Sequence, residues 1–161
     1  MSEQISARSL KKVSLFTGLT ESELAEIAKL CQEKSYQAGE CCLTIGEKTE
    51  AVHFVQKGRV GVETQIPDAP TGRKDVILAA LGPGEVFSWS ALMGKIPTAS
   101  VRAIESAKVI SIDADTLIAL CESNSRIGYV VMKNLASIIS SRLKRHRLAL
   151  LSAVSGIGEG W

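Results

Sequence analysis

Between Tyr36 and Asp113 the chain alternates short apolar segments with turn-forming residues, and this pattern constrains the fold more than any other feature. Proline and glycine residues in Ile66–Gly72 predict a loop at the tip of a hairpin. Several short strands at this spacing are typical of an all-β sandwich or barrel. The predicted strands are Cys41–Ile45, Ala51–Val55, Arg59–Gln65, Val76–Ala80, Val101–Ile104 and Val109–Asp113.

Helical patterns precede this region, over residues 7–34. A short helix is expected over 7–14. Thr20 and Glu23 then have the spacing of a capping box, in which each side chain accepts a hydrogen bond from the other residue's backbone. The box predicts a second helix, over 21–33.

A second helical region, 115–153, follows the strands. Asp115 is expected to cap a short helix over 116–122, and a long helix is predicted over 126–153. The Gly-rich end, Ser155–Trp161, is expected to be frayed.

Two apolar stripes run along the long helix. One stops halfway, and it consists of Ile127, Val131, Leu135 and Ile138. The other has the heptad spacing of a seam for a partner helix, and it consists of Tyr129, Met132, Ala136, Ile139, Leu143, His146 and Leu150. We therefore predict a homodimer with Met132, Ala136, Ile139, Leu143 and His146 in its seam. The alternative is a helix packed wholly on its own domain.

Composition limits the classes of protein that the chain can represent. With 161 residues and 45% hydrophobic content, a single domain over 1–161 is expected. The chain has no apolar run near the roughly 20 residues that span a membrane and no signal-peptide pattern, which predicts a cytoplasmic protein without membrane contact. A net charge of +2 does not indicate a nucleic-acid binder.

Basic residues cluster late in the long helix: Arg142, Lys144, Arg145, His146 and Arg147. We expect this basic patch to be a solvated surface near a helix C-terminus. Contact with nucleic acid or an acidic partner is the alternative.

The sequence offers little for catalysis or metal binding. The four cysteines match no zinc or redox spacing, so free thiols are expected. The two histidines, His53 and His146, are far apart, which argues against a His-based metal site. Neither a G-x-S-x-G nor a P-loop pattern is present. We therefore predict a non-catalytic protein without a metal.

Five short motifs occur in an order and spacing that resemble the cyclic nucleotide-binding domain family, the effector module of catabolite activator-type regulators. They are Leu15–Thr20, Tyr36–Glu40, Phe54–Val60, Leu81–Glu85 and Ala99–Ala103. The resemblance covers about residues 10–150. It implies a jelly-roll-like β-roll over 36–113 with N-terminal helices, a long C-terminal helix, and a phosphate-binding cassette over 84–101.

In this family a cassette glutamate accepts a hydrogen bond from the ribose, and a cassette arginine pairs with the cyclic phosphate. These positions fall on Ser88 and Pro97 here, and a shift of one residue gives Trp89 and Thr98. Between residues 86 and 101 the one charged side chain is Lys95. The candidate ligand-binding residues are Ser88, Trp89, Ser90, Ala91, Pro97, Thr98, Ala99 and Ser100.

The missing charges predict weak binding of cyclic AMP. Two hydrogen bonds to charged groups contribute roughly 3–6 kcal/mol together, or two to four orders of magnitude in affinity. A dissociation constant above about 100 μM is expected. Trp89 is expected either to close the core or to stack on a ligand ring.

The resemblance implies a regulatory sensor for a cyclic nucleotide (cAMP or cGMP) or another small anion, which signals through the long helix to a downstream protein. A ligand-independent dimerisation or docking module is the alternative. A further alternative is the effector half of a transcriptional regulator without its helix-turn-helix domain. About ten residues follow the long helix, too few for that domain, so DNA binding by this chain is not expected.

Overall fold

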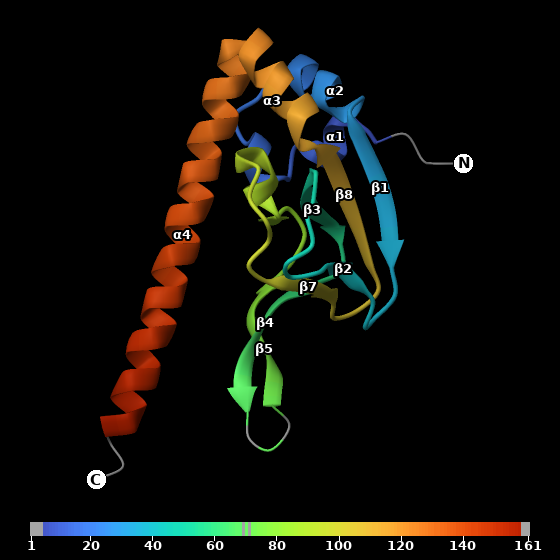
Figure 1. The fold of residues 1–161 in the computed structure, drawn as a ribbon. Helices are drawn as coiled ribbons and strands as arrows, with labels where there is room; N and C mark the ends of the chain where they lie inside the picture. The colour runs from blue at the N-terminus through green and yellow to red at the C-terminus, as the bar shows by residue number, and fades with distance from the viewer. Residues whose placement is uncertain (1–4, 69, 71, 159–161) are drawn as a thin grey trace.

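Two four-stranded antiparallel sheets form a β-roll with helices at one end, as the ribbon in Figure 1 shows. The computed structural model describes residues 5–68, 70 and 72–158. The strands are β1 (Cys31–Tyr36), β2 (Cys41–Leu43), β3 (Ala51–Lys57), β4 (Val60–Asp68), β5 (Gly72–Leu81), β6 (Val86–Phe87), β7 (Ser100–Ala103) and β8 (Ala107–Asp113). One sheet has the order β1-β8-β3-β6 and the other β2-β7-β4-β5. The predicted fold class, mainly β with flanking helices, is confirmed.

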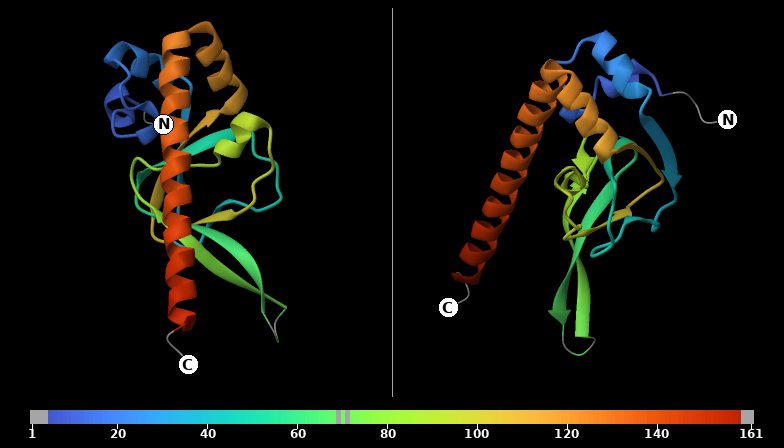
Figure 2. Two further views of the ribbon diagram at one scale, coloured as in Figure 1. Left: turned by 90° about the vertical axis from the view of Figure 1, so that its left-hand side faces the viewer. Right: turned by 45° about the horizontal axis from the view of Figure 1, so that its top comes forward.

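In the sequence, one short helix lies between β6 and β7, and the other helices precede or follow the strands. They are α1 (Ala7–Leu10), the 3₁₀ helix η1 (Ser14–Phe16), α2 (Glu21–Ala28), the 3₁₀ helix η2 (Trp89–Met93), α3 (Ala114–Ser123) and α4 (Ser125–Gly158). The two views in Figure 2 show α4 crossing the roll and extending past it, toward the same end as the β4–β5 hairpin.

The start of α2 is as predicted, but its end is not. The Thr20 hydroxyl accepts from the Glu23 backbone N–H, and the Glu23 carboxylate accepts from the Thr20 N–H, so the capping box is confirmed. The helix ends at Ala28 rather than at 33, and β1 begins at Cys31. Pairing with β8 supplies the hydrogen bonds of this mostly polar edge strand, so tertiary context overrides the helical pattern.

Two shorter stretches also differ from the prediction. Ile66–Asp68 belongs to β4 rather than to a loop. Beyond Glu63, β4 has β5 on one side and no partner in β7, so the missing N–H of Pro67 is tolerated. The cap of α3 is Asp113, whose carboxylate accepts from the Thr116 N–H at 2.8 Å, and not Asp115.

The C-terminal end of α4 is longer than predicted. The helix continues to Gly158, so the part of the predicted frayed end that the structure describes, residues 155–158, is helical. The remaining part of that prediction, residues 159–161, lies outside the described residues.

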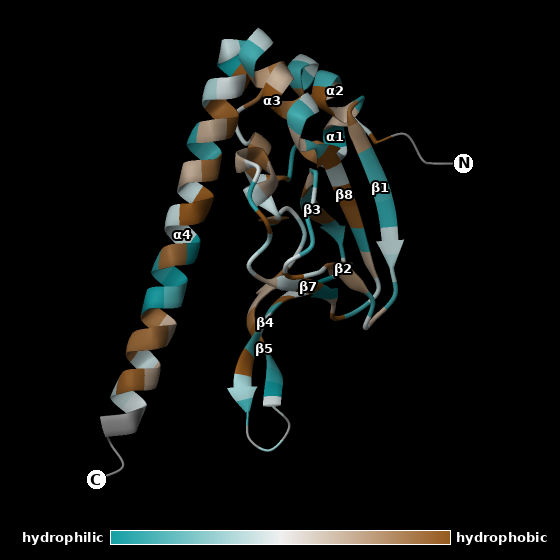
Figure 3. Cartoon of the chain, viewed as in Figure 1, coloured by the Kyte–Doolittle hydropathy of each residue, from teal (hydrophilic) through white to brown (hydrophobic). Residues whose placement is uncertain are grey.

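The two stripes of α4 have different environments. Ile127 and Val131 are fully buried and Leu135 is 8% exposed, because they pack on the core formed with the N-terminal helices. The seam residues face outward, with Met132 41% and Leu143 67% exposed. Figure 3 shows apolar residues continuing along the part of α4 that extends past the roll. The stripe that stops halfway therefore packs the first half of α4 on its own domain.

Candidate ligand-binding site

The cassette begins at a glycine turn that is fixed on two sides. Gly84 has a φ of +87°, a conformation that favours glycine. Its N–H donates to the Val55 carbonyl of β3 at 2.8 Å, and its carbonyl accepts from the Ser14 N–H of η1 at 3.0 Å. These bonds set where β6 and η2 enter the roll.

Ser88 joins β6 to η2 in a left-handed conformation, with φ 56° and ψ 30°. Its hydroxyl donates to the Ala51 carbonyl at 3.0 Å and lies in hydrogen-bonding contact with Nδ1 of His53. Since a hydroxyl has one hydrogen, His53 donates through its Nδ1–H. Ser88 therefore uses its side chain to fasten the cassette to β3, and it does not cap η2.

His53 is held in its neutral form beneath the cassette. Its ring stacks on Phe87, with centroids 5.1 Å apart and an interplanar angle of 11°. Burial lowers the pKa of His53 to about 4. The neutral ring can therefore keep its bond to Ser88 across the physiological pH range.

A pocket of about 470 Å³ opens between the cassette and α4. Six of the eight candidate residues line it: Ser88, Trp89, Ser90, Pro97, Thr98 and Ala99. The other two lie beside it. Ala91 is buried in the core, and the Ser100 hydroxyl accepts from the Ile45 N–H at 2.9 Å. The remaining lining residues are Leu43, Val62, Leu78, Ala79, Phe87, Val101, Ile139, Arg142, Leu143 and His146.

The pocket is lined mostly by apolar side chains, together with the positively charged side chain of Arg142. The described residues around the pocket include no aspartate or glutamate, and Arg142 is the one lysine or arginine among them. Aliphatic walls suit a ring system, while the hydroxyls of Ser90 and Thr98 offer neutral polar groups.

Arg142 is turned into the domain and does not lie on a solvated surface, so this part of the prediction for the basic patch is wrong. Its Nη2 donates to the Val86 carbonyl, and its guanidinium carbon lies 4.4 Å from the centroid of the Trp89 ring. Burial lowers the pKa of Arg142 to about 10, which leaves it charged at neutral pH. The other basic residues of the patch, Lys144, Arg145, His146 and Arg147, are exposed.

The sequence contained a signal for this orientation. The buried stripe of α4 ends at Ile138, but steps of four and three residues lead on to Arg142 and Arg145. Arg145 lies 3.4 Å from the carboxylate of Glu85, at the start of the cassette. On the face of α4 that contacts its own domain, the apolar residues are thus followed by arginines. A search for apolar periodicity alone does not detect these arginines.

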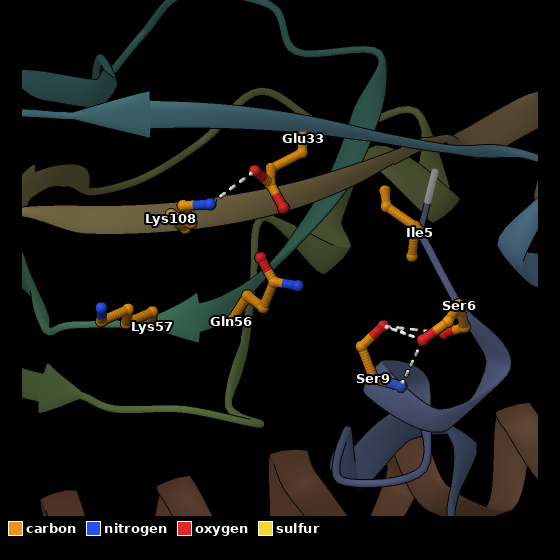
Figure 4. Close-up of a pocket in the computed structure, with 7 residues that line it drawn as sticks. All are labelled: Ile5, Ser6, Ser9, Glu33, Gln56, Lys57 and Lys108. Carbon is orange, nitrogen blue, oxygen red and sulfur yellow. Dashed lines mark hydrogen bonds and ion pairs between the residues drawn. The ribbon is translucent and has the colours of Figure 1, made fainter. Parts of the chain in front are cut away.

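Another pocket of about 470 Å³ lies between α1 and the β1-β8-β3 part of the first sheet (Figure 4). Lys108 is paired with Glu33 at 3.2 Å, and the Ser6 and Ser9 hydroxyls are 3.1 Å apart. Lys57 and Gln56 also line this pocket, and the Oε1 of Gln56 is buried without a hydrogen-bond partner in the described part of the chain.

Two further searches concern the described residues alone. In residues 5–68, 70 and 72–158, no three His, Cys, Asp or Glu side chains cluster in a way that could hold a metal. Over the same residues, no helix has the length and apolar character needed to cross a membrane.

Comparisons with known proteins show which family and fold the chain resembles. The family model of the cyclic nucleotide-binding domain matches residues 33–124. Glutaminase 1 of Bradyrhizobium diazoefficiens is 31% identical over 134 residues, which are 83% of this chain and 21% of that protein. The chain thus spans about a fifth of the length of this relative.

Two solved structures have similar folds. A cyclic nucleotide-binding domain of Methylobacillus flagellatus has a TM-score of 0.78 at 20% identity, covering 93% of this chain and 82% of that one. The regulatory domain of Toxoplasma gondii PKA, crystallised with cAMP, has a TM-score of 0.61 at 26% identity, covering 72% and 42%. The family model matches more than half of the chain, and so the chain belongs to the cyclic nucleotide-binding domain family.

Proposed function

We propose that the chain is a non-catalytic sensor module that binds a cyclic nucleotide, or another small anion, between its cassette and α4. The observation that carries this proposal is the pocket shared by Trp89 of η2, Thr98 of the cassette and Arg142 of α4. A related regulatory domain, that of Toxoplasma gondii PKA, was crystallised with cAMP.

The lining of the pocket supports weak or altered nucleotide binding. Its apolar walls fit a base, and its arginine fits a phosphate. No carboxylate among the described lining residues can accept a hydrogen bond from a ribose hydroxyl. We therefore keep the expectation of a dissociation constant for cAMP above about 100 μM.

Ligand binding would be transmitted through α4. We propose that the predicted seam residues of this helix form the interface of a homodimer. Ile139, Leu143 and His146 belong to the predicted seam and also line the pocket. A ligand and a partner helix would therefore contact the same side chains. A downstream protein would recognise the resulting arrangement of the two helices.

A thermal-shift and calorimetry panel with cAMP, cGMP, 5′-AMP and adenosine tests the ligand class. A cyclic nucleotide that binds the pocket is expected to raise the unfolding temperature saturably. Ala99→Phe, which adds a ring at the pocket wall, should abolish the shift, whereas Ala38→Phe in an exposed turn should not. No shift by any of these compounds would favour the ligand-independent docking module instead.

A further inference from the structure

We propose that Arg142 of α4 is the residue that binds the phosphate of the ligand, in place of the charged groups that the cassette lacks. This inference rests on the proposed function, and it identifies the side chain that would bind the phosphate of the ligand. It places the anion-binding charge on the helix instead of on the cassette.

The first argument is where the guanidinium lies. Arg142 reaches from α4 across the Trp89 ring and binds the Val86 carbonyl through one nitrogen. Its Nε is buried and has no hydrogen-bond partner in the described part of the chain. A guanidinium has five N–H donors, so most of them remain for an anion that enters the pocket.

The second argument is the charge around Arg142. Burial lowers the pKa of Arg142, and the nearby carboxylate of Glu85, which partly offsets this lowering, is paired with Arg145 at 3.4 Å. Among the described residues Arg142 forms no ion pair of its own. A partly desolvated cation without a paired carboxylate is costly, and an anion in the same pocket would offset that cost.

The third argument is the fit of the remaining surface to a phosphate-bearing ring compound. The pocket is apolar on the β4–β5 side, where Val62 and Leu78 lie, and polar where Ser90 and Thr98 lie. A ring would occupy the apolar side, with its phosphate directed toward Arg142. Trp89, held under the guanidinium, would form part of the wall between them.

Another role for Arg142 has to be separated from this one. The contacts with Trp89 and Val86 alone would make Arg142 a clamp that fastens α4 to the cassette, with a cation–π contact as its main interaction. A clamp would affect the position of α4 but would not distinguish a charged ligand from its neutral counterpart.

The test uses fluorine NMR of 5-fluorotryptophan in a Trp161→Phe background, where Trp89 is the one tryptophan. The starting protein, Arg142→Gln, Arg142→Lys and the matched control Arg147→Gln are titrated with cAMP, adenosine and inorganic phosphate, each to about 10 mM. Arg147 is an exposed basic residue of the same helix.

We expect Arg142→Gln to weaken cAMP binding about 10- to 100-fold, the loss of a hydrogen bond to a charged group. Arg142→Lys should lose less, because it keeps the charge but not the fork of donors. Arg147→Gln should match the starting protein. Adenosine should bind all four proteins alike, which also shows that the pocket is intact.

Two results would overturn the assignment of Arg142 and leave the proposed function standing. One is equal cAMP affinity in the starting protein and Arg142→Gln. The other is equal weakening of cAMP and adenosine, which is what a structural clamp predicts. If neither cAMP nor phosphate moves the Trp89 resonance of the starting protein, both this inference and a nucleotide ligand are contradicted.

Discussion

At the scale of single residues, a few polar contacts fasten the cassette, which contains the short helix η2, to strand β3. Ser88 adopts a left-handed conformation, and its hydroxyl donates to the Ala51 carbonyl and accepts from Nδ1–H of His53, both in β3. The resemblance to the family leads us to expect the ribose-binding glutamate here, and a serine stands in its place. The departure from the family pattern therefore has a local role: it ties the cassette to the sheet.

His53 gives the fold a specific dependence on pH. Its pKa is about 4 in the folded chain and about 6.5 when unfolded, so the unfolded chain takes up the proton first as pH falls. The contribution of neutral His53 to the free energy of unfolding is therefore complete above about pH 6.5. It is lost as the pH falls toward 4, by up to about 1.4 kcal/mol per pH unit.

Urea unfolding at about pH 7 and pH 4.5 measures this contribution. We expect the starting protein to lose about 2 kcal/mol more than His53→Gln between these pH values. Lys144→Gln, which changes an exposed residue of α4 outside the predicted seam and the pocket lining, should behave as the starting protein does. Parallel losses in all three proteins would contradict the buried, neutral His53.

At the scale of elements, α4 performs different tasks along its length. Its first half is a core helix through Val131 and Leu135, and its middle meets the cassette through Arg142. Beyond that point its apolar residues are exposed, among them Leu148 at 52% and Leu151 at 55%.

Shortening the side chains at two positions of α4 to alanine tests this division between a packed and an exposed part. Leu135→Ala should lower the free energy of unfolding by about 2–4 kcal/mol, because it leaves a cavity against the N-terminal helices. Leu148→Ala, an exposed leucine off the predicted seam, should change it by less than about 0.5 kcal/mol. Similar losses measured by urea unfolding would show that α4 is not packed as described.

The elements also show what the sequence could predict. The capping box at Thr20 and the stripe that includes Ile127 follow local rules, and both are confirmed. Strand β1 could not be found in this way, because its mostly polar residues are held by pairing with β8. Six candidate residues of the cassette do line one pocket, since they are close in sequence. Arg142 lies more than forty residues from the cassette, and its contact depends on how α4 packs.

At the scale of the whole molecule, the pocket and the proposed dimer seam use overlapping side chains. Ile139 and Leu143 take part in both, so changing them would confound ligand binding with assembly. Met132 and Leu150 lie on the seam outside the pocket lining, and both are exposed. They offer a way to examine assembly alone.

Met132→Asp combined with Leu150→Asp should yield monomers, because each change places a charge in the apolar seam. Light scattering at tens of micromolar should then give half the mass of the starting protein. Leu148→Asp, off the seam, should leave the mass unchanged. A monomeric starting protein at this concentration would contradict the dimer.

Hydrogen–deuterium exchange with and without cAMP at about 10 mM tests most directly whether α4 completes the ligand site. The account predicts slower exchange in two separated stretches, 86–99 of the cassette and 136–150 of α4, with no change in the outer β4 residues 64–68. Protection confined to the cassette, with α4 unchanged, would contradict it.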